Sequence, residues 1–178
     1  MITTEIYKGQ GLGNQLWCYV TTRVIALDRK LDFGITTREN LKCQDFMSLD
    51  CGKQVSGIQN HYDEHWLFHC KTGSDIRLYD ENLSKVADGT KIDGCLQDEQ
   101  YIVHRRNEIR EWLKVNQNCE FRDFSKDNIC IINFRGSGYI HDKDFFLPPR
   151  YWKDAIKNMR KINPAFKFIV ITEDVASA

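Results

Sequence analysis

Two glycine-rich turns, each between a strand-like run and a helix-like run, place the strongest constraint on how this chain folds. The first is Gly9-Gln10-Gly11-Leu12-Gly13-Asn14-Gln15-Leu16, and the second is Asn133-Phe134-Arg135-Gly136-Ser137-Gly138-Tyr139. Because glycine has no side chain, such turns let backbone N–H groups approach a bound phosphate or sugar closely. Arg135 in the second turn is suited to gripping a diphosphate through two parallel hydrogen bonds. The pair predicts a two-lobed α/β enzyme with a nucleotide-type ligand in its cleft.

The first part of the chain reads as alternating strands and helices. Ile2–Tyr7 is short and β-prone, and apolar residues recur at helical spacing from Asn14 to Leu31. A further strand is expected at Lys91–Leu96, followed by a helix that Asp98 caps and that runs to about Lys114. Short strand-like pieces also lie at 33–35 and 55–58.

The last quarter predicts a β-α-β unit with a parallel sheet. Ile129–Ile132 and Phe166–Ile171 are continuous apolar runs, as expected of strands that are buried on both faces. Pro148 and Pro149 open the helix between them, where a missing N–H costs nothing, and Pro164 ends it.

A polar stretch at 116–127 separates these two parts and is the expected linker. We therefore predict an N-terminal α/β lobe over residues 1–120 and a second lobe that begins at 128 and continues to 178.

Composition excludes several classes of partner. Lys and Arg together number 25, as do Asp and Glu, so no net charge attracts nucleic acid or an acidic membrane. No apolar run approaches the roughly 20 residues that cross a bilayer. The seven cysteines include no Cys-x-x-Cys pair, and no secretory signal precedes the first strand. We expect a cytoplasmic protein with no transmembrane segment and no nucleic-acid partner.

The spacing His61-x-x-x-His65-x-x-x-His69 would place three imidazoles on one face of a helix, an arrangement that can bind zinc. The residues Trp66-Leu67-Phe68 between them favour a packed helix with histidines in the core or at the surface. We therefore predict no metal site here.

Five segments resemble, in the right order, those of the α-1,2-fucosyltransferases (glycosyltransferase family eleven). Gly11–Tyr19 is similar to that family's G-G-L-G-N-Q-L-F-Q-Y-A opening, and Gly94–Tyr101 to its G-Y-x-Q-S-E-K-Y-F segment. Asn133–Tyr139 is similar to H-x-R-R-G-D-Y, Leu147–Ile156 to the Y-Y-x-x-A-I helix, and Val170–Asp174 to the F-S-D-D strand end.

The resemblance implies a GT-B-like fold of two Rossmann-type lobes with parallel sheets, and an inverting, metal-independent transfer of fucose from GDP-fucose to a glycan hydroxyl. No cofactor is implied beyond the donor substrate, which is GDP-fucose or a related sugar nucleotide. The first lobe would be the acceptor side, and the second would bind the nucleotide sugar. Arg135 and Asn14 are the implied catalytic residues, with Arg135 on the β-phosphate. The implied binding residues are Gly11, Gly13, Gln15, Gly136, Ser137, Gly138, Tyr139, Glu173 and Asp174.

The chain also departs from the family. Asn133, Gly136 and Gly138 replace the histidine, the second arginine and the aspartate of H-x-R-R-G-D-Y. Family members are longer, so we expect an incomplete second lobe whose exposed apolar surface favours a homodimer. His141, Asp142 and Asp144 lie within loop reach of the site, but none is assigned as the general base.

Two other functions stay open. Gly9-x-Gly11-x-Gly13 is one residue short of the dinucleotide fingerprint G-x-G-x-x-G. Asp32 lies about 20 residues farther along, where that fingerprint has a ribose-binding acid. A nicotinamide-dependent oxidoreductase is therefore the rival enzyme. A truncated, non-catalytic remnant that still binds a sugar nucleotide is the third possibility.

Overall fold

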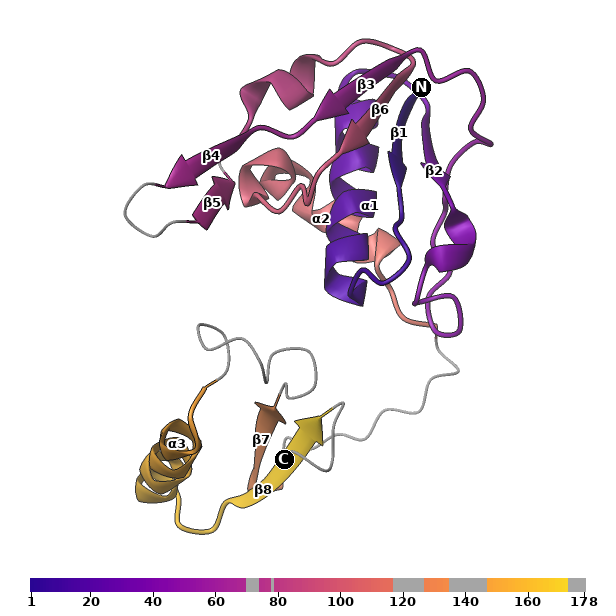
Figure 1. Cartoon of the computed structure of the whole chain (residues 1–178). Helices are drawn as coiled ribbons and strands as arrows, with labels where there is room; N and C mark the ends of the chain where they lie inside the picture. Colours follow the sequence, from indigo (N-terminus) through magenta and orange to yellow (C-terminus); the bar gives the residue numbers. More distant parts are fainter. Residues whose placement is uncertain (70–73, 78, 117–126, 135–146, 173–178) are drawn as a thin grey trace. The chain divides into compact units, whose positions relative to one another are not determined.

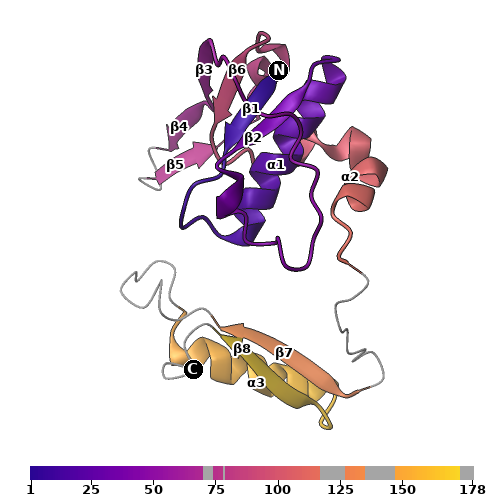
Figure 2. The same cartoon turned by 90° about the vertical axis from the view of Figure 1, so that its right-hand side faces the viewer.

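The computed structural model describes residues 1–69, 74–77, 79–116, 127–134 and 147–172, with the backbone alone for 66–69 and 74–77. The chain divides into two compact units, Met1–Cys119 and Glu120–Ala178. Figures 1 and 2 show the elements of each unit from two directions.

The first unit is built on a four-stranded sheet in which every pairing is parallel (Figure 1). Its strands are β1 (Ile2–Glu5), β2 (Phe33–Thr36), β6 (Thr90–Asp93) and β3 (Asn60–Asp63), in the order β2-β1-β6-β3. Helix α1 (Leu12–Asp28) joins β1 to β2, as parallel neighbours require a crossover. This mixed α/β architecture confirms the predicted class and is consistent with a Rossmann-like fold.

Smaller elements complete the first unit. Strands β4 (Trp66–His69) and β5 (Ser74–Arg77) pair antiparallel. Four 3₁₀ turns, η1 (Arg38–Asn40), η2 (Glu81–Lys85), η3 (Glu99–Tyr101) and η4 (Val103–Arg105), precede the short helix α2 (Arg106–Trp112). In the part of the chain that the structure describes, no helix is both long enough and apolar enough to cross a membrane.

One face of the sheet and one side of α1 form the hydrophobic core. Register places Thr4, Ile35 and Ile92 side by side on this face, because paired residues of neighbouring parallel strands point the same way. The fully buried apolar side chains of this layer include Ile2, Ile6, Ile35 and Ile92 from the strands and Cys18, Tyr19 and Val24 from α1. Each such aliphatic or aromatic residue contributes about 1.5–3 kcal/mol by its burial.

Three sequence expectations in this unit are wrong. The segment expected to form a histidine-bearing helix is two strands, β3 and β4, as its aromatic content favours, so His61, His65 and His69 share no helix face. The predicted helix from Asp98 is interrupted at Ile102, whose φ of −128° is non-helical, and a regular helix begins only at Arg106. No strand forms at 55–58, where Gly57 takes a φ of +68°.

The second unit is the predicted β-α-β unit. Strands β7 (Ile129–Phe134) and β8 (Lys167–Thr172) pair in parallel, and α3 (Pro149–Ile162) connects them (Figure 2). The Trp152 ring of α3 packs edge-on against Phe134, with 5.6 Å between ring centroids. The expectation of strands buried on both faces is wrong, since Ile131 and Ile171 are 52% and 54% exposed. The predicted linker falls almost entirely outside the described residues.

The layered core of the first unit predicts a large cost for removing side-chain volume from the sheet. Ile92→Ala is expected to lower the free energy of unfolding by about 2–5 kcal/mol, because it leaves a cavity under α1. The same change at Ile58, which is 44% exposed, is expected to stay within about 0.5 kcal/mol. Urea titration followed by circular dichroism measures both, and equal losses in the two variants would contradict the packing.

Candidate functional site

The carboxyl ends of four parallel strands meet at one edge of the first unit's sheet, which is where ligands bind in open α/β folds. The glycine-rich turn follows β1 at this edge, and the turn Gly94–Gln97 follows β6. Because β1 and β6 are neighbours, these two turns start side by side. They define the candidate site.

The glycine-rich turn presents open backbone to this edge. Gly11 caps α1 with an extended conformation (φ −65°, ψ 151°), and no described side chain caps the helix. A Cβ placed on Gly11 or on Gly13 would meet no described atom within 4 Å. The start of this 17-residue helix therefore has room beside its glycines and no side-chain cap among the described residues, which suits an anionic or hydroxyl-rich ligand.

Asn14 joins the two turns. Its Oδ1 accepts a hydrogen bond of 2.8 Å from Gln97 Nε2, across 83 residues of sequence, and both side chains are exposed. An amide pair of this kind keeps three N–H donors, two on Asn14 and one on Gln97, and several acceptor sites available to a ligand's hydroxyl groups. Asn14 thus lies where the sequence analysis expected a site residue, and Gln97 joins it.

Gln15 has a different role from the ligand-binding one expected for it. Its side chain is fully buried, and its amide donates to the Asn40 carbonyl at 2.9 Å and accepts from the Lys42 N–H at 3.0 Å. Asn40 in turn donates to the Ile6 carbonyl at 2.7 Å. Gln15 therefore fixes the loop after β2 against the end of β1, and it presents no group to the candidate site.

A buried carboxylate fixes the turn after β6. Glu64, only 3% exposed, accepts hydrogen bonds from the Cys95 and Leu96 N–H groups at 2.9 and 3.0 Å. Gly94 lies so close to Glu64 that a Cβ there would come within 2.5 Å of the Glu64 Cβ. Leu96 holds a left-handed φ of +54°, and its carbonyl accepts from the Thr21 hydroxyl at 3.0 Å. Strain held by surrounding contacts in this way is typical of functional sites.

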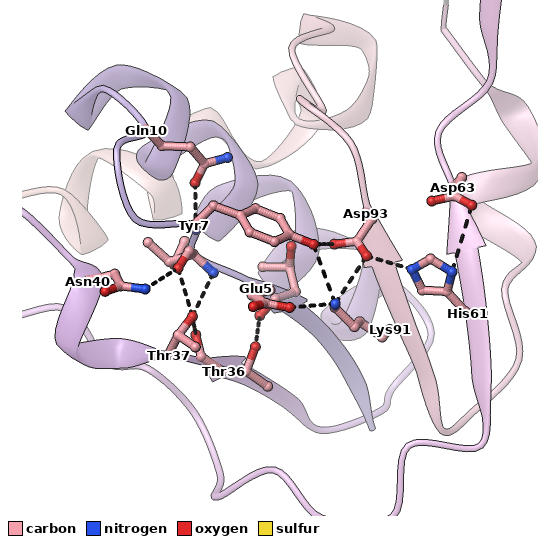
Figure 3. A network of polar contacts seen from close by, with 12 residues as sticks. Glu5, Tyr7, Gln10, Thr36, Thr37, Asn40, His61, Asp63, Lys91 and Asp93 are labelled. Atoms are coloured by element: carbon pink, nitrogen blue, oxygen red, sulfur yellow. Dashed lines mark hydrogen bonds and ion pairs between the residues drawn. The ribbon is translucent and has the colours of Figure 1, made fainter.

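The sheet face opposite α1 carries a polar network near the same edge (Figure 3). Asp93 accepts hydrogen bonds from the Tyr7 hydroxyl at 2.9 Å and from His61 Nε2 at 2.5 Å, and its other contact is Lys91 Nζ at 3.1 Å. Lys91 also pairs with Glu5 at 2.6 Å. Glu5, Lys91 and Asp93 are half-buried, so these charges are stabilised by one another as well as by solvent.

This network sets the protonation of its members. Burial alone would raise the pKa of Asp93, but hydrogen bonds from His61, Lys91 and Tyr7 outweigh it and hold that pKa below its usual value. Burial would lower the pKa of Lys91, and the bonds to Glu5 and Asp93 raise it instead. Burial and the bond to Asp93 raise the pKa of Tyr7. Asp93 is therefore a fixed, ionised acceptor and a weak base, which suits it to positioning groups.

His61, Asp63 and Asp93 bring three metal-ligating atoms within 4.8 Å of one another. Lys91 already lies 3.1 Å from the Asp93 carboxylate and supplies a positive charge there. A metal ion would have to compete with this lysine, so the contacts are accounted for by an ion-pair network.

Asp32 bears on the nicotinamide hypothesis. It lies just before β2, and its carbonyl accepts from the Ile2 N–H at 2.7 Å, so it sits at the amino edge of the sheet. Its carboxylate pairs with Lys53 at 2.7 Å. A ribose-binding acid belongs at the carboxyl edge, beside the glycine-rich turn. The position of Asp32 counts against a dinucleotide site.

The expected residues of the second lobe lie outside the described residues. They are Arg135, Gly136, Ser137, Gly138, Tyr139, Glu173 and Asp174, together with His141, Asp142 and Asp144. Phe134 and Thr172, the last residues of β7 and β8, are register partners at one end of a parallel pair. Both predicted segments therefore follow in sequence from the same edge of this sheet.

Sequence reasoning missed Glu64, Asp93 and Gln97 as site residues. Asp93 is the last residue of the strand β6, and Gln97 lies in the turn that follows it. Polar residues directly after a predicted strand are the signal that could have identified both. Glu64 gave no signal, because its partners are backbone N–H groups more than 30 residues away.

Comparison with protein-family models, curated proteins and solved structures finds no match to this chain. The expected family therefore rests on the five sequence segments.

The close contact at Gly94 predicts that the turn after β6 tolerates no side chain. Gly94→Ala is expected to cost about 1–3 kcal/mol of folding free energy, because the new methyl group overlaps Glu64. Gly13→Ala is the matched control, and it is expected to stabilise the helix by about 0.5–1 kcal/mol. Chemical denaturation of both variants checks this, and an unchanged Gly94→Ala protein would refute the contact.

The lowered pKa of Asp93 predicts an acid-sensitive contribution to stability. A carboxyl group whose pKa falls on folding stabilises the folded state above its unfolded pKa of about 3.9, and this is lost as pH falls through the folded value. Asp93→Asn is expected to lower the Tm at pH 7 and to flatten its decline below about pH 4. Thermal melts from pH 7 to pH 2 measure this, with exposed Asp45→Asn as the charge-matched control. Identical profiles for the two variants would exclude a special role for Asp93.

Proposed function

We propose that this protein is an inverting, metal-independent glycosyltransferase of the α-1,2-fucosyltransferase type, which transfers fucose from GDP-fucose to a glycan hydroxyl. The observation that carries the proposal is the Asn14–Gln97 hydrogen bond. It joins Gly11–Tyr19 and Gly94–Tyr101, two of the segments that resemble the family, at the carboxyl edge of a parallel sheet. A shared site requires the two segments to lie together, and the pairing of β1 with β6 brings them to the same edge.

The chain's two units support a division of labour of the GT-B kind. The first unit would hold the acceptor side, with the open turn at Gly11 and Gly13 and the amide of Asn14 beside sugar hydroxyls. The second unit would hold the donor, with Arg135 at the diphosphate and Glu173 and Asp174 on the nucleotide side.

In the proposed reaction an acceptor hydroxyl oxygen attacks C1 of fucose. A new C1–O bond forms as the bond from C1 to the β-phosphate oxygen breaks, and GDP leaves with that electron pair. Arg135 would stabilise the charge developing on the diphosphate. Asn14 would act by orienting sugar hydroxyls, which is an effect of geometry. The hydroxyl proton passes to solvent or to a base outside the described residues.

The donor-binding part of the proposal is tested by calorimetry with GDP and GDP-fucose. Arg135→Ala is expected to weaken binding about 10- to 150-fold, because one charge-assisted contact contributes about 1.5–3 kcal/mol. Arg150→Ala is the matched control, since the Arg150 side chain is 92% exposed and its ion pair among the described residues is with Asp154 one helical turn away. NADH is titrated alongside.

Three outcomes would contradict the proposal. Binding of NADH in place of GDP-fucose would favour the oxidoreductase, and equal binding in the two arginine variants would remove Arg135 from the site. GDP-fucose binding without any transfer to neutral or carboxylate-bearing glycan acceptors would leave a non-catalytic sugar-nucleotide-binding protein.

A further inference from the structure

A second concave site lies in the first unit, between the start of α1 and the segment that runs through η3, η4 and α2. It is a cavity of about 370 Å³, a size typical of small-ligand sites. Its lining is mostly apolar with charged groups at intervals: Trp17, Glu99, Ile102, Val103, Arg106, Ile109 and Arg110. Nothing in the sequence analysis or in the proposed reaction uses this cavity.

Two arginines of the lining have no partner among the residues that the structure describes. Arg106 and Arg110 are four residues apart on α2, so they lie on the same face of the helix, and both are exposed. The neighbouring Arg105 instead pairs with Asp28 at 2.6 Å and with Glu108 at 2.9 Å. Glu99 lines the same cavity without forming an ion pair to either arginine. Two guanidinium groups therefore face one apolar cavity with their charge uncompensated by the described chain.

The cavity lies next to the Asn14–Gln97 pair. Trp17 follows Asn14 by three residues on α1, so their side chains are neighbours on the helix surface. Glu99 follows Gln97 by two residues. A ligand of two or three sugar rings that touched the amide pair could extend directly into the cavity.

We propose that this cavity is the acceptor subsite and that it selects a saccharide bearing a carboxylate. The inference rests on the proposed function, because it assumes that the amide pair faces the acceptor. Trp17, Ile102 and Val103 offer apolar surface to the C–H face of a sugar ring. Arg106 and Arg110 offer forked N–H donors, whose geometry matches a planar carboxylate.

Size and charge favour an acidic sugar over an acidic protein segment. A cavity of about 370 Å³ lies at the small end of the range for ligand sites, which suits a compact ligand better than an extended peptide. The apolar wall would contribute nothing to a chain of acidic side chains held at the surface. A sugar acid uses both the wall and the arginines.

Calorimetry on the whole chain tests the subsite with sialyllactose and digalacturonic acid as carboxylate-bearing probes and lactose as the neutral probe. At least one acidic probe is expected to bind at least tenfold more tightly than lactose. Arg106→Gln/Arg110→Gln is expected to abolish this preference and to leave lactose binding unchanged. Arg105→Gln, which removes a neighbouring arginine outside the cavity, is expected to keep the preference. Circular dichroism melts verify that each variant is folded.

Equal binding of acidic and neutral probes to the unmodified chain would overturn the subsite, as would a preference that survives in the double variant. Tighter binding of a hexaglutamate peptide than of either acidic sugar would also overturn it and would indicate an acidic-protein surface. GDP-fucose is titrated into the same samples. A preference that depends on Arg106 and Arg110, in proteins that fail to bind GDP-fucose, would count against the proposed donor and not against the subsite.

Discussion

The arrangement of the candidate site depends on one buried carboxylate. Glu64 holds the Cys95 and Leu96 N–H groups, and the absence of a side chain at Gly94 is what lets it come so close. Removing a charged acceptor from two buried donors leaves both unsatisfied, which is more costly than losing a neutral bond. The turn therefore has one conformation, and that conformation directs Gln97 toward Asn14. The hydrogen bond that links the two turns is thus set by a residue that belongs to neither turn.

The sheet has two faces with opposite chemistry, and each has its own role. The face under α1 is apolar and supplies the core, whereas the other face carries Glu5, Lys91 and Asp93 in mutual contact. Since residues alternate along a strand, the same four-residue segments build both layers. The cost of half-burying these charges is offset by their pairing, so the polar face remains compatible with folding. The ionised network also places fixed charge beside the carboxyl edge without a bound ion.

Sequence reasoning identified the elements whose signal is local. The helix α1, the strand before it and the β-α-β unit were predicted because periodicity, glycines and prolines mark them directly. It failed where tertiary pairing decides: the segment around His61 has helical spacing of histidines, yet its aromatic neighbours pair as strands. It also misassigned Gln15, whose side-chain amide forms its hydrogen bonds with the backbone of Asn40 and Lys42. These two residues belong to the loop after β2, and the sequence alone did not show that this loop lies against α1. The role of Glu64 could not be predicted either. Its partners are backbone N–H groups, and these leave no pattern of residue types in the sequence.

Charge explains why recognition in this chain has to be local. With 25 basic and 25 acidic residues there is no long-range field to gather an anionic ligand. Most described arginines of the first unit already form hydrogen bonds or ion pairs within the chain. Arg23 contacts Tyr19 and Asp50, and Arg38 donates to the carbonyls of 51–53. Arg106 and Arg110 differ in that they form no ion pair with any described residue, and they line a cavity whose wall is mostly apolar. An unpaired guanidinium beside an apolar wall keeps its full capacity to bind a carboxylate. Selectivity for an acidic ligand then arises from two residues, against a background that is electrostatically neutral.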